Sequence, residues 1–315
     1  MQEKGKHYVI GDVHGCYEDF LLLKEKIEKR DPEATIILTG DFLDRGPGVW
    51  EMLGWAIENI RPGGKYQSVL GNHEEMVLEW YREWKCWYQS NHQKKEPNTY
   101  YDFDMVMRSH DALTPEKLDP VMEFLGKLPF RIEVEMDNGV KFDIVHASDT
   151  FEVTVNEEER KERNLWWRSH DVNRQKDIII VHGHTPTVSG LYQYMDSDRR
   201  RRGMIGYMRN DINVDGGCFV GKNDSRKLPY PCMLCAICLE TLEEIYPRTL
   251  EEQFACQNGI SEKEAEKMAW LRQILEWQRD LSDNKEFMAT LKLDLDVFSD
   301  SVYAFTPQGK VIPLP

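Results

Sequence analysis

The chain has 315 residues, of which 41% are hydrophobic and 30% are charged, so it is long enough for one large globular domain with a full core. Its formal net charge of −15 argues against nucleic acid or an anionic membrane as a partner. No apolar run approaches the ~20 residues of a membrane helix. A charged N-terminus without a signal-peptide pattern and an odd number of cysteines, seven, together favour reduced thiols in a cytoplasm.

Short apolar runs alternate with helical patterns from the N-terminus onward. We expect strands at 8–10, 35–39 and 66–70, helices at 17–30 and 49–60 between them, and two further strands at 142–146 and 177–182. This order is typical of βαβ units and predicts an α/β fold. Residues 76–128 are expected to form a mostly helical cap or side region, whose aromatic residues favour a packed helix face over a ligand site.

Three cysteines near the end of this domain admit two interpretations. Cys232, Cys235 and Cys238 lie in a segment that otherwise resembles an apolar strand. No fourth ligand follows at zinc-finger spacing, so buried strand cysteines are favoured over a metal cluster.

Polar clusters follow the predicted strands: GDVHG at 11–15, GDFLDRG at 40–46, GNHEE at 71–75, VHAS at 145–148 and VHGHTP at 181–186. Asp12 and Asp41 are 29 residues apart and Asp41 and Asn72 are 31 apart, the length of one βαβ unit. The first three loops should therefore meet at one edge of a parallel sheet.

The residue types in these loops are those of a transition-metal site. Aspartate, asparagine and histidine suit Mn²⁺, Fe or Zn²⁺, and the set is too rich in nitrogen for a typical Mg²⁺ site. Two metals ~3.5–4 Å apart can bind a phosphate and generate a hydroxide nucleophile, and Asp41 is the central candidate for a bridging carboxylate. The candidate ligands are Asp12, His14, Asp41, Asn72, His146 and His184, with His182 competing for the last place.

Three further residues could complete a hydrolase site. Arg45 follows Asp41 closely, and a guanidinium matches the geometry of a phosphate. His73 directly follows Asn72 and could protonate the leaving group, while Asp44 could orient His73 and raise its pKa.

Over residues 7–250 these motifs resemble the PPP-type metallophosphatases, which include bacterial and phage serine/threonine protein phosphatases such as that of bacteriophage lambda. The resemblance implies a calcineurin-like metallophosphoesterase β-sandwich flanked by helices. It also implies two bound divalent ions, with Mn²⁺ the favoured metal. It assigns Asp12, His14 and Asp41 to one metal, and Asp41, Asn72, His146 and His184 to the other. It implies that His73 and Asp44 form the acid pair, and that Arg45 and, from NLWWR, Arg168 contact the phosphate.

Some positions depart from the eukaryotic pattern. Ala147 and Ser148 stand where eukaryotic members have two glycines, and GHTP and NHEEM are closer to the phage and bacterial enzymes. GDVHGC and RGPG are also shared with the symmetrical diadenosine tetraphosphatases. We therefore expect a phosphoprotein phosphatase, with a dinucleoside polyphosphate hydrolase as the alternative and a non-catalytic binding protein as a third possibility. The substrate would be a phosphorylated protein or small phosphoester, and the oligomeric state stays open.

The sequence changes character near residue 250. We expect a phosphatase domain at 1–250 and a short α+β appendage at 251–315, with an amphipathic helix from about 259 and a hairpin at 301–315 that turns at Pro307–Gly309. The stretch 259–315 resembles the segment of RelA/SpoT-type (p)ppGpp synthetases that leads into their TGS domain. It carries no catalytic motif, so a fusion or truncation is the favoured interpretation.

Overall fold

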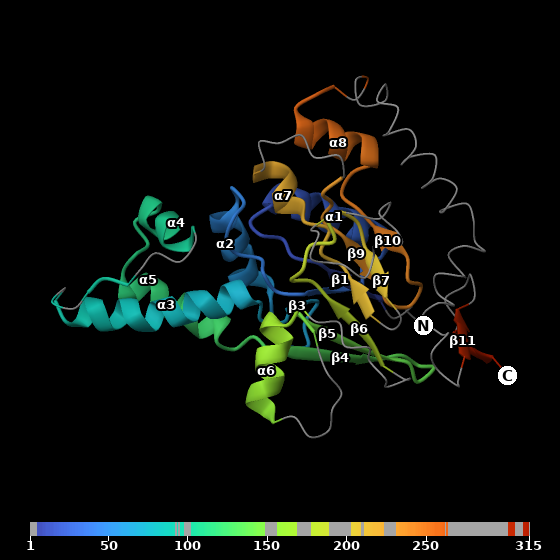
Figure 1. Ribbon diagram of the computed structural model, residues 1–315, viewed down its shortest axis with the longest axis horizontal. Coiled ribbons are helices and arrows are strands. Elements are labelled where there is room, and N and C mark those ends of the chain that lie inside the picture. Colours follow the sequence, from blue (N-terminus) through green and yellow to red (C-terminus); the bar gives the residue numbers. More distant parts are fainter. Residues whose placement is uncertain are drawn as a thin grey trace.

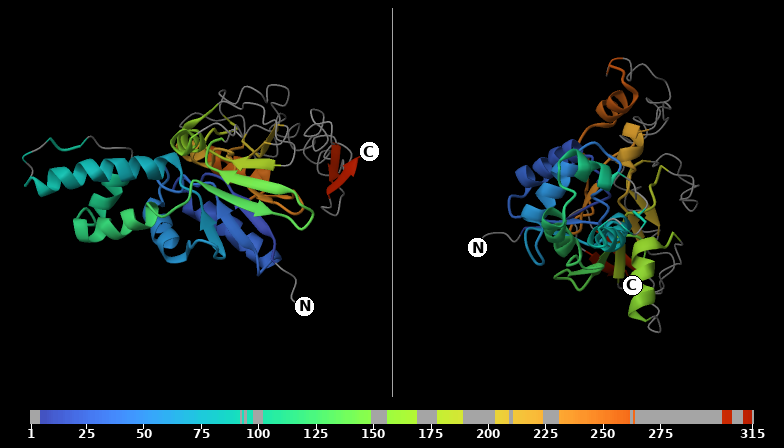
Figure 2. Two further views of the ribbon diagram at one scale, coloured as in Figure 1. Left: turned by 90° about the horizontal axis from the view of Figure 1, so that it is seen from below. Right: turned by 90° about the vertical axis from the view of Figure 1, so that its left-hand side faces the viewer.

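The computed structural model describes residues 5–91, 93, 95–97, 102–148, 156–168, 178–188, 203–208, 211–223, 231–261, 263, 302–305 and 311–314. Two five-stranded sheets lie face to face, and helices cover the outer side of the first sheet (Figures 1 and 2). This arrangement is the α/β sandwich that the sequence predicts.

Three adjacent strands of the first sheet are parallel to one another. Beyond them lie two more strands, each of which runs antiparallel to its neighbour on the side of the parallel strands. In the order β10–β9–β1–β2–β3, its strands are Glu244–Ile245, Ala236–Cys238, His7–Ile10, Thr35–Leu38 and Tyr66–Ser68. The two connecting helices are α1, Tyr17–Arg30, and α2, Val49–Asn59. The bounds of β1, β2, β3 and the two helices lie within two residues of those that the sequence predicts.

The second sheet is mixed as well. In the order β4–β5–β6–β8–β7, its strands are Arg131–Glu135, Lys141–Val145, Ile178–His182, Asp211–Asn213 and Gly206–Met208. Strands β5, β6 and β8 are parallel, and the two edge strands are antiparallel to their neighbours. Helix α6, Glu157–Trp166, lies between β5 and β6 in the chain.

Side-chain alternation along β1 explains the two layers of core. Tyr8 and Ile10 pack toward the helices, whereas Val9 belongs to the core between the sheets, where Ile144 and Ile212 meet it from the second sheet. Helix α1 seals the outer layer because Phe20, Leu23 and Ile27 recur at helical spacing on one face. The two cores therefore follow from the alternation of side chains along β1 and from the helical spacing of apolar residues in α1.

Helix α1 is also tied to the edge strand β3 through the carboxylate of Glu28. Lys24 and Lys65 approach it at 2.8 and 3.0 Å, and the Tyr66 hydroxyl donates a hydrogen bond to it. Burial alone would raise the pKa of Glu28, but these hydrogen bonds outweigh it and lower the pKa to about 2.

The helical side region extends away from the sheets (Figure 1). It comprises α3, Asn72–Gln89, α4, Phe103–Ser109, and α5, Pro115–Leu125. Trp80, Tyr81 and Trp84 of α3 are buried, as expected for a packed face. The helix begins at Asn72, four residues earlier than the stretch identified from sequence, so it carries Asn72 and His73 in its first turn.

The remaining elements are α7, Cys218–Asn223, α8, Leu250–Asn258, and the antiparallel pair β11, Val302–Phe305, and β12, Val311–Leu314. Leu250 and Phe254 of α8 are buried in the core between the sheets, so the packed fold continues past the predicted boundary at 250. The division into two domains stays a prediction. Most of the predicted tail helix and the hairpin turn lie outside the described residues.

None of the seven cysteines, all within the described part of the chain, forms a disulfide bond. Cys232, Cys235 and Cys238 are buried, but only Cys238 lies in a strand, β9. None of the helices that the structure describes is long and apolar enough to span a membrane.

Candidate active site

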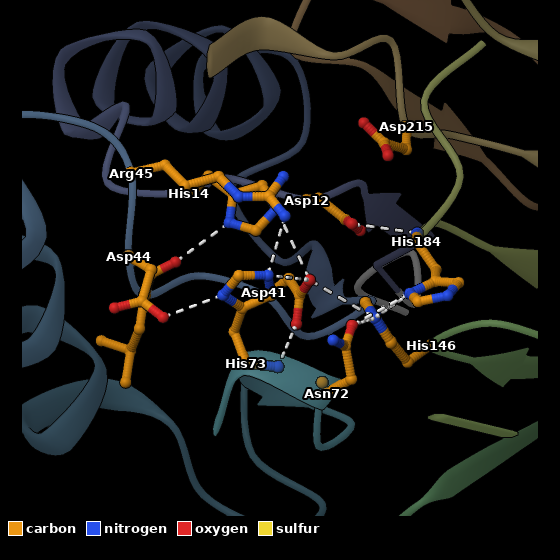
Figure 3. Close-up of polar contacts among 12 residues, drawn as sticks. Asp12, His14, Asp41, Asp44, Arg45, Asn72, His73, His146, His184 and Asp215 are labelled. Atoms are coloured by element: carbon orange, nitrogen blue, oxygen red, sulfur yellow. Dashed lines mark hydrogen bonds and ion pairs between the residues drawn. The ribbon is translucent and has the colours of Figure 1, made fainter. Parts of the chain in front are cut away.

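The six candidate ligands come from loops that follow strands of both sheets. Asp12 and His14 follow β1, Asp41 follows β2, and Asn72 begins α3 just after β3. His146 and His184 follow β5 and β6 of the second sheet. Because these strand ends meet at one side of the sandwich, the structure brings all six together (Figure 3).

The loops hold these residues in an unusual backbone conformation. Five non-glycine residues of the site have positive φ angles: His14 (44°), Asp41 (47°), Asp44 (62°), Arg45 (71°) and His184 (66°). Such conformations are costly outside glycine and cluster at functional sites. Hydrogen bonds between the loops maintain them, among them His14 N to Asp41 O at 2.9 Å.

Two glycines let the loops approach one another. A Cβ atom at Gly183 would overlap Oδ1 of Asp12, and one at Gly71 would overlap the backbone nitrogen of Asp41. The glycines are therefore required by close packing at the site.

Asp41 occupies the centre. Its Oδ2 lies 3.5 Å from His14 Nε2, 3.4 Å from His146 Nε2 and 3.8 Å from His73 Nε2. Its Oδ1 accepts a hydrogen bond from the backbone nitrogen of His73 at 2.9 Å. One carboxylate thus faces donor atoms on both sides, as a bridging ligand must.

The residues predicted to hold the second metal converge on one point beside Asp41. Asn72 Oδ1 lies 2.7 Å from His146 Nε2 and 2.9 Å from His184 Nδ1, and the two nitrogens are 3.1 Å apart. His146 Nδ1 lies 2.8 Å from the carbonyl oxygen of Thr39, so Nδ1 carries the proton and Nε2 presents a lone pair. A lone pair that faces two oxygen acceptors fits a cation between them.

The same logic applies to His14. Its Nδ1 donates to the carbonyl oxygen of Leu43 at 3.0 Å, so its Nε2 lone pair faces Asp41. His14, Asp41 and His73 form one compact donor group, and Asp41, His146 and His184 form the other. Asp12 belongs to neither group, and its two oxygens accept hydrogen bonds from Thr39 Oγ1 and the backbone nitrogen of His184.

The protonation states suit metal binding. Burial lowers the pKa of His14 well below its usual range and also lowers that of His146. Burial and the neighbouring charges of His146 and Arg168 lower the pKa of His184 to about 2. Burial would raise the pKa of Asp41, but the positive charges that the three neighbouring imidazoles carry when protonated outweigh this effect and lower it. Neutral imidazoles around an ionised carboxylate are the forms that ligate a divalent ion.

His73, Asp44 and Arg45 form a second feature beside this cluster. His73 Nδ1 lies 2.8 Å from Asp44 Oδ2, and Arg45 Nη2 lies 2.9 Å from His73 Nε2. The Arg45 guanidinium also lies over the ring of Phe219, 4.3 Å from its centroid. Burial lowers the pKa of His73, but the charge of Asp41 and the hydrogen bond to Asp44 outweigh it, so the pKa is raised.

The last two candidates are Arg168 and His182, and the structure places only Arg168 beside the donor cluster. Arg168 Nη1 donates to Thr185 Oγ1 at 3.1 Å and to His184 O at 3.3 Å, which places it at the His184 side of the site. His182 does not join the donor cluster: its Nε2 contacts Asp211 Oδ1 at 2.6 Å. The structure therefore separates His182 from His184, which sequence spacing alone could not do.

One supporting residue was not identified from sequence. Glu74 is fully buried, and its carboxylate accepts hydrogen bonds from the backbone nitrogens of Asp41 (2.8 Å), Leu43 (3.1 Å) and Gly71 (3.0 Å). It therefore joins the second and third loops directly beneath the site. The GNHEE motif contains Glu74, but nothing in the motif distinguishes this buried carboxylate from a helix-surface one.

Two donor groups thus share one carboxylate at the strand ends of an α/β sandwich, an arrangement that could hold two metal ions. Residues 6–216 match the calcineurin-like phosphoesterase family, and the chain belongs to that family. Members of this family use divalent metals, which agrees with the donor chemistry of the cluster.

Individual relatives match shorter stretches. A symmetrical bis(5'-nucleosyl)-tetraphosphatase of Cronobacter sakazakii is 42% identical over 71 residues, which is 22% of this chain and 24% of that protein. A GTP pyrophosphokinase of Myxococcus xanthus is 44% identical over 84 residues, 23% of this chain and 11% of that protein. This chain thus spans a quarter or less of the length of these relatives. The crystal structure of a metallophosphoesterase from Sphaerobacter thermophilus aligns with 84% of this chain and 98% of that one, at 15% identity and a TM-score of 0.43.

Proposed function

We propose that the protein is a phosphomonoesterase that dephosphorylates phosphoserine, phosphothreonine or phosphotyrosine in proteins. The observation that carries this proposal is the row of Asp44, His73 and Arg45 beside the bridging Asp41. It combines a cation for phosphate oxygens with a buried, carboxylate-oriented imidazole, the two groups that hydrolysis of a phosphomonoester requires besides metals.

Asp12, His14 and Asp41 would hold one metal, and Asp41, Asn72, His146 and His184 the other, with Mn²⁺ our proposed ion. Two divalent ions there would supply Lewis-acid chemistry, neutralising phosphate charge and activating water.

The protein's own groups then divide the remaining work. Arg45 can donate to His73 Nε2 only while that nitrogen is unprotonated. When a phosphate oxygen accepts the guanidinium donors instead, His73 Nε2 is released and can take up the proton that it later delivers to the leaving oxygen. Asp44 holds Nδ1 throughout and stabilises the imidazolium.

Purified protein loaded with Mn²⁺ tests the proposal. It should hydrolyse p-nitrophenyl phosphate and release inorganic phosphate from phosphopeptides. Activity on neither substrate, in protein that retains two metal ions, would exclude a phosphomonoesterase.

A second candidate is hydrolysis of dinucleoside polyphosphates. The match to a bis(5'-nucleosyl)-tetraphosphatase supports it, and so does Trp166, which is 41% exposed and lies with its ring centroid 6.4 Å from that of His184. An exposed indole beside a phosphate site can stack on a nucleobase. Diadenosine tetraphosphate should then be cleaved to ADP, detected by chromatography, and Trp166→Ala should raise its KM while leaving that for p-nitrophenyl phosphate unchanged.

We further propose a cytoplasmic location, which is supported by seven cysteines that form no disulfide bond in the described part of the chain. We also propose that residues 259–315 derive from a RelA/SpoT-type protein, which the match to a GTP pyrophosphokinase supports. If so, removing residues 262–315 should leave phosphatase turnover and metal content unchanged. A loss of either would give the tail a part in the phosphatase.

A further inference from the structure

Asp215 is a buried carboxylate to which neither the sequence motifs nor the proposed chemistry gives a role. It follows β8, and its side chain is almost completely buried, with only 2% of the residue exposed. Its Oδ1 accepts a hydrogen bond from the backbone nitrogen of Gly217 at 2.9 Å. Its Oδ2 is buried and has no hydrogen-bond partner in the described part of the chain.

A purely structural role accounts for only one of the two carboxylate oxygens of Asp215. The Oδ1 contact closes a local turn, as Asp and Asn commonly do. A buried carboxylate oxygen without a donor is costly, and such exceptions in native proteins need a cause, such as an ion. An asparagine would close the same turn without placing a charge in the protein interior.

The surroundings of Asp215 point to a cation. Its side chain projects from its loop toward Asp12 and Arg45 (Figure 3). Asp12, Asp41 and Asp215 are all almost completely buried, with 2% of each residue exposed. Three carboxylates thus lie where water is largely excluded, and a divalent ion is the charge that stabilises all three in their ionised form.

We propose that Asp215 is a positioning residue of the metal site, whose unpaired Oδ2 and negative charge strengthen the binding of the divalent ion held by Asp12, His14 and Asp41. Asp215 lies outside the two compact donor groups, as Asp12 does, and we assign it no direct bond to the metal. Residues in this position typically change metal affinity ~10–100-fold. The inference rests on the two-metal function proposed above.

Metal binding by Asp215→Asn tests this directly, because asparagine keeps the Oδ1 acceptor for Gly217 and removes only the charge. Mn²⁺ binding to metal-free protein would be measured by isothermal titration calorimetry for the wild type, Asp215→Asn and Asp215→Ser. Asp104→Asn is the matched control, since Asp104 is also a buried carboxylate with an unpartnered oxygen, but lies in the helical side region.

We expect one of the two Mn²⁺ ions to bind ~10–100-fold more weakly to both Asp215 variants, and Asp104→Asn to bind both as the wild type does. The metal-free Asp215→Asn protein should melt no lower than the wild type, because the substitution relieves repulsion, whereas Mn²⁺ should raise its melting temperature less. Wild-type affinity in Asp215→Asn, with the wild type binding two ions, would overturn this inference alone. A wild type that binds no metal would overturn both this inference and the proposed function.

Discussion

Replacing His73 by asparagine separates proton transfer from metal binding. His73 Nε2 is 3.8 Å from Asp41 Oδ2, farther than the nitrogens of His14 and His146, and its Nδ1 is committed to Asp44. If His73 is the general acid, its loss should lower kcat about 10²–10⁴-fold. That factor corresponds to about 3–5 kcal/mol of transition-state stabilisation. Metal content should stay near that of the wild type.

The assay compares two leaving groups. A phosphoserine peptide leaves as a basic alkoxide that needs a proton, whereas p-nitrophenolate leaves readily without one, so the loss in His73→Asn should be far larger for the peptide. Metal content is measured by plasma mass spectrometry on the same samples. His110→Asn, which alters an exposed histidine stacked on Trp50, serves as the control.

Two results would refute this reasoning. Equal losses on both substrates would show that His73 does not protonate the leaving group. Metal content that falls in parallel with turnover would make His73 a ligand, a role that its place in one compact donor group permits.

Three further perturbations test other parts of the structure. Asp41→Asn should lose most of the bound metal, because the substitution removes the charge that the two donor groups share. Plasma mass spectrometry would measure the metal content, and two retained ions would rule out Asp41 as a bridge. Gly183→Ala should destabilise the metal-free protein by about 1–3 kcal/mol in urea unfolding, because the added methyl group would overlap Asp12. Gly54→Ala is the control, since Gly54 has open space around it and its substitution should not destabilise the protein. Equal effects of the two substitutions would contradict the close packing at Gly183. Because folding lowers the pKa of Glu28 from 4.5 to about 2, its charge contributes fully above pH 4.5 and less as the pH falls toward 2. The stability difference between wild type and Glu28→Gln should therefore shrink between pH 6 and 3, and a constant difference would contradict the lowered pKa.

Much of this fold was predictable because the sequence is strictly patterned. The apolar runs of β1, β2 and β3 end at glycine-rich loops, and helical spacing fixes α1 to the observed residues. The position of β9 was not predictable, since it pairs with β1 from the far end of the domain. That pairing is decided by tertiary packing between the sheets, which leaves little trace in local sequence.

In the site, too, some residues could be predicted from the sequence and others could not. Asp41 could be proposed as the centre because its loop follows a strand at the spacing of a βαβ unit. The roles of Glu74 and Asp215 depend on partners in other loops and on burial, which a single sequence does not reveal. His182 and His184 are two residues apart in the sequence. His184 has a positive φ and joins the cluster, whereas His182 contacts Asp211.

The central claim is that two divalent ions bind at the shared Asp41 and that hydrolysis requires them. Metal-free protein would be titrated with Mn²⁺ while bound metal is counted and phosphate release from p-nitrophenyl phosphate is recorded. We predict two Mn²⁺ ions per chain, with turnover that rises as the second ion binds and disappears with a chelator. Fewer than two ions in a fully active protein, or turnover that persists in excess chelator, would contradict the account.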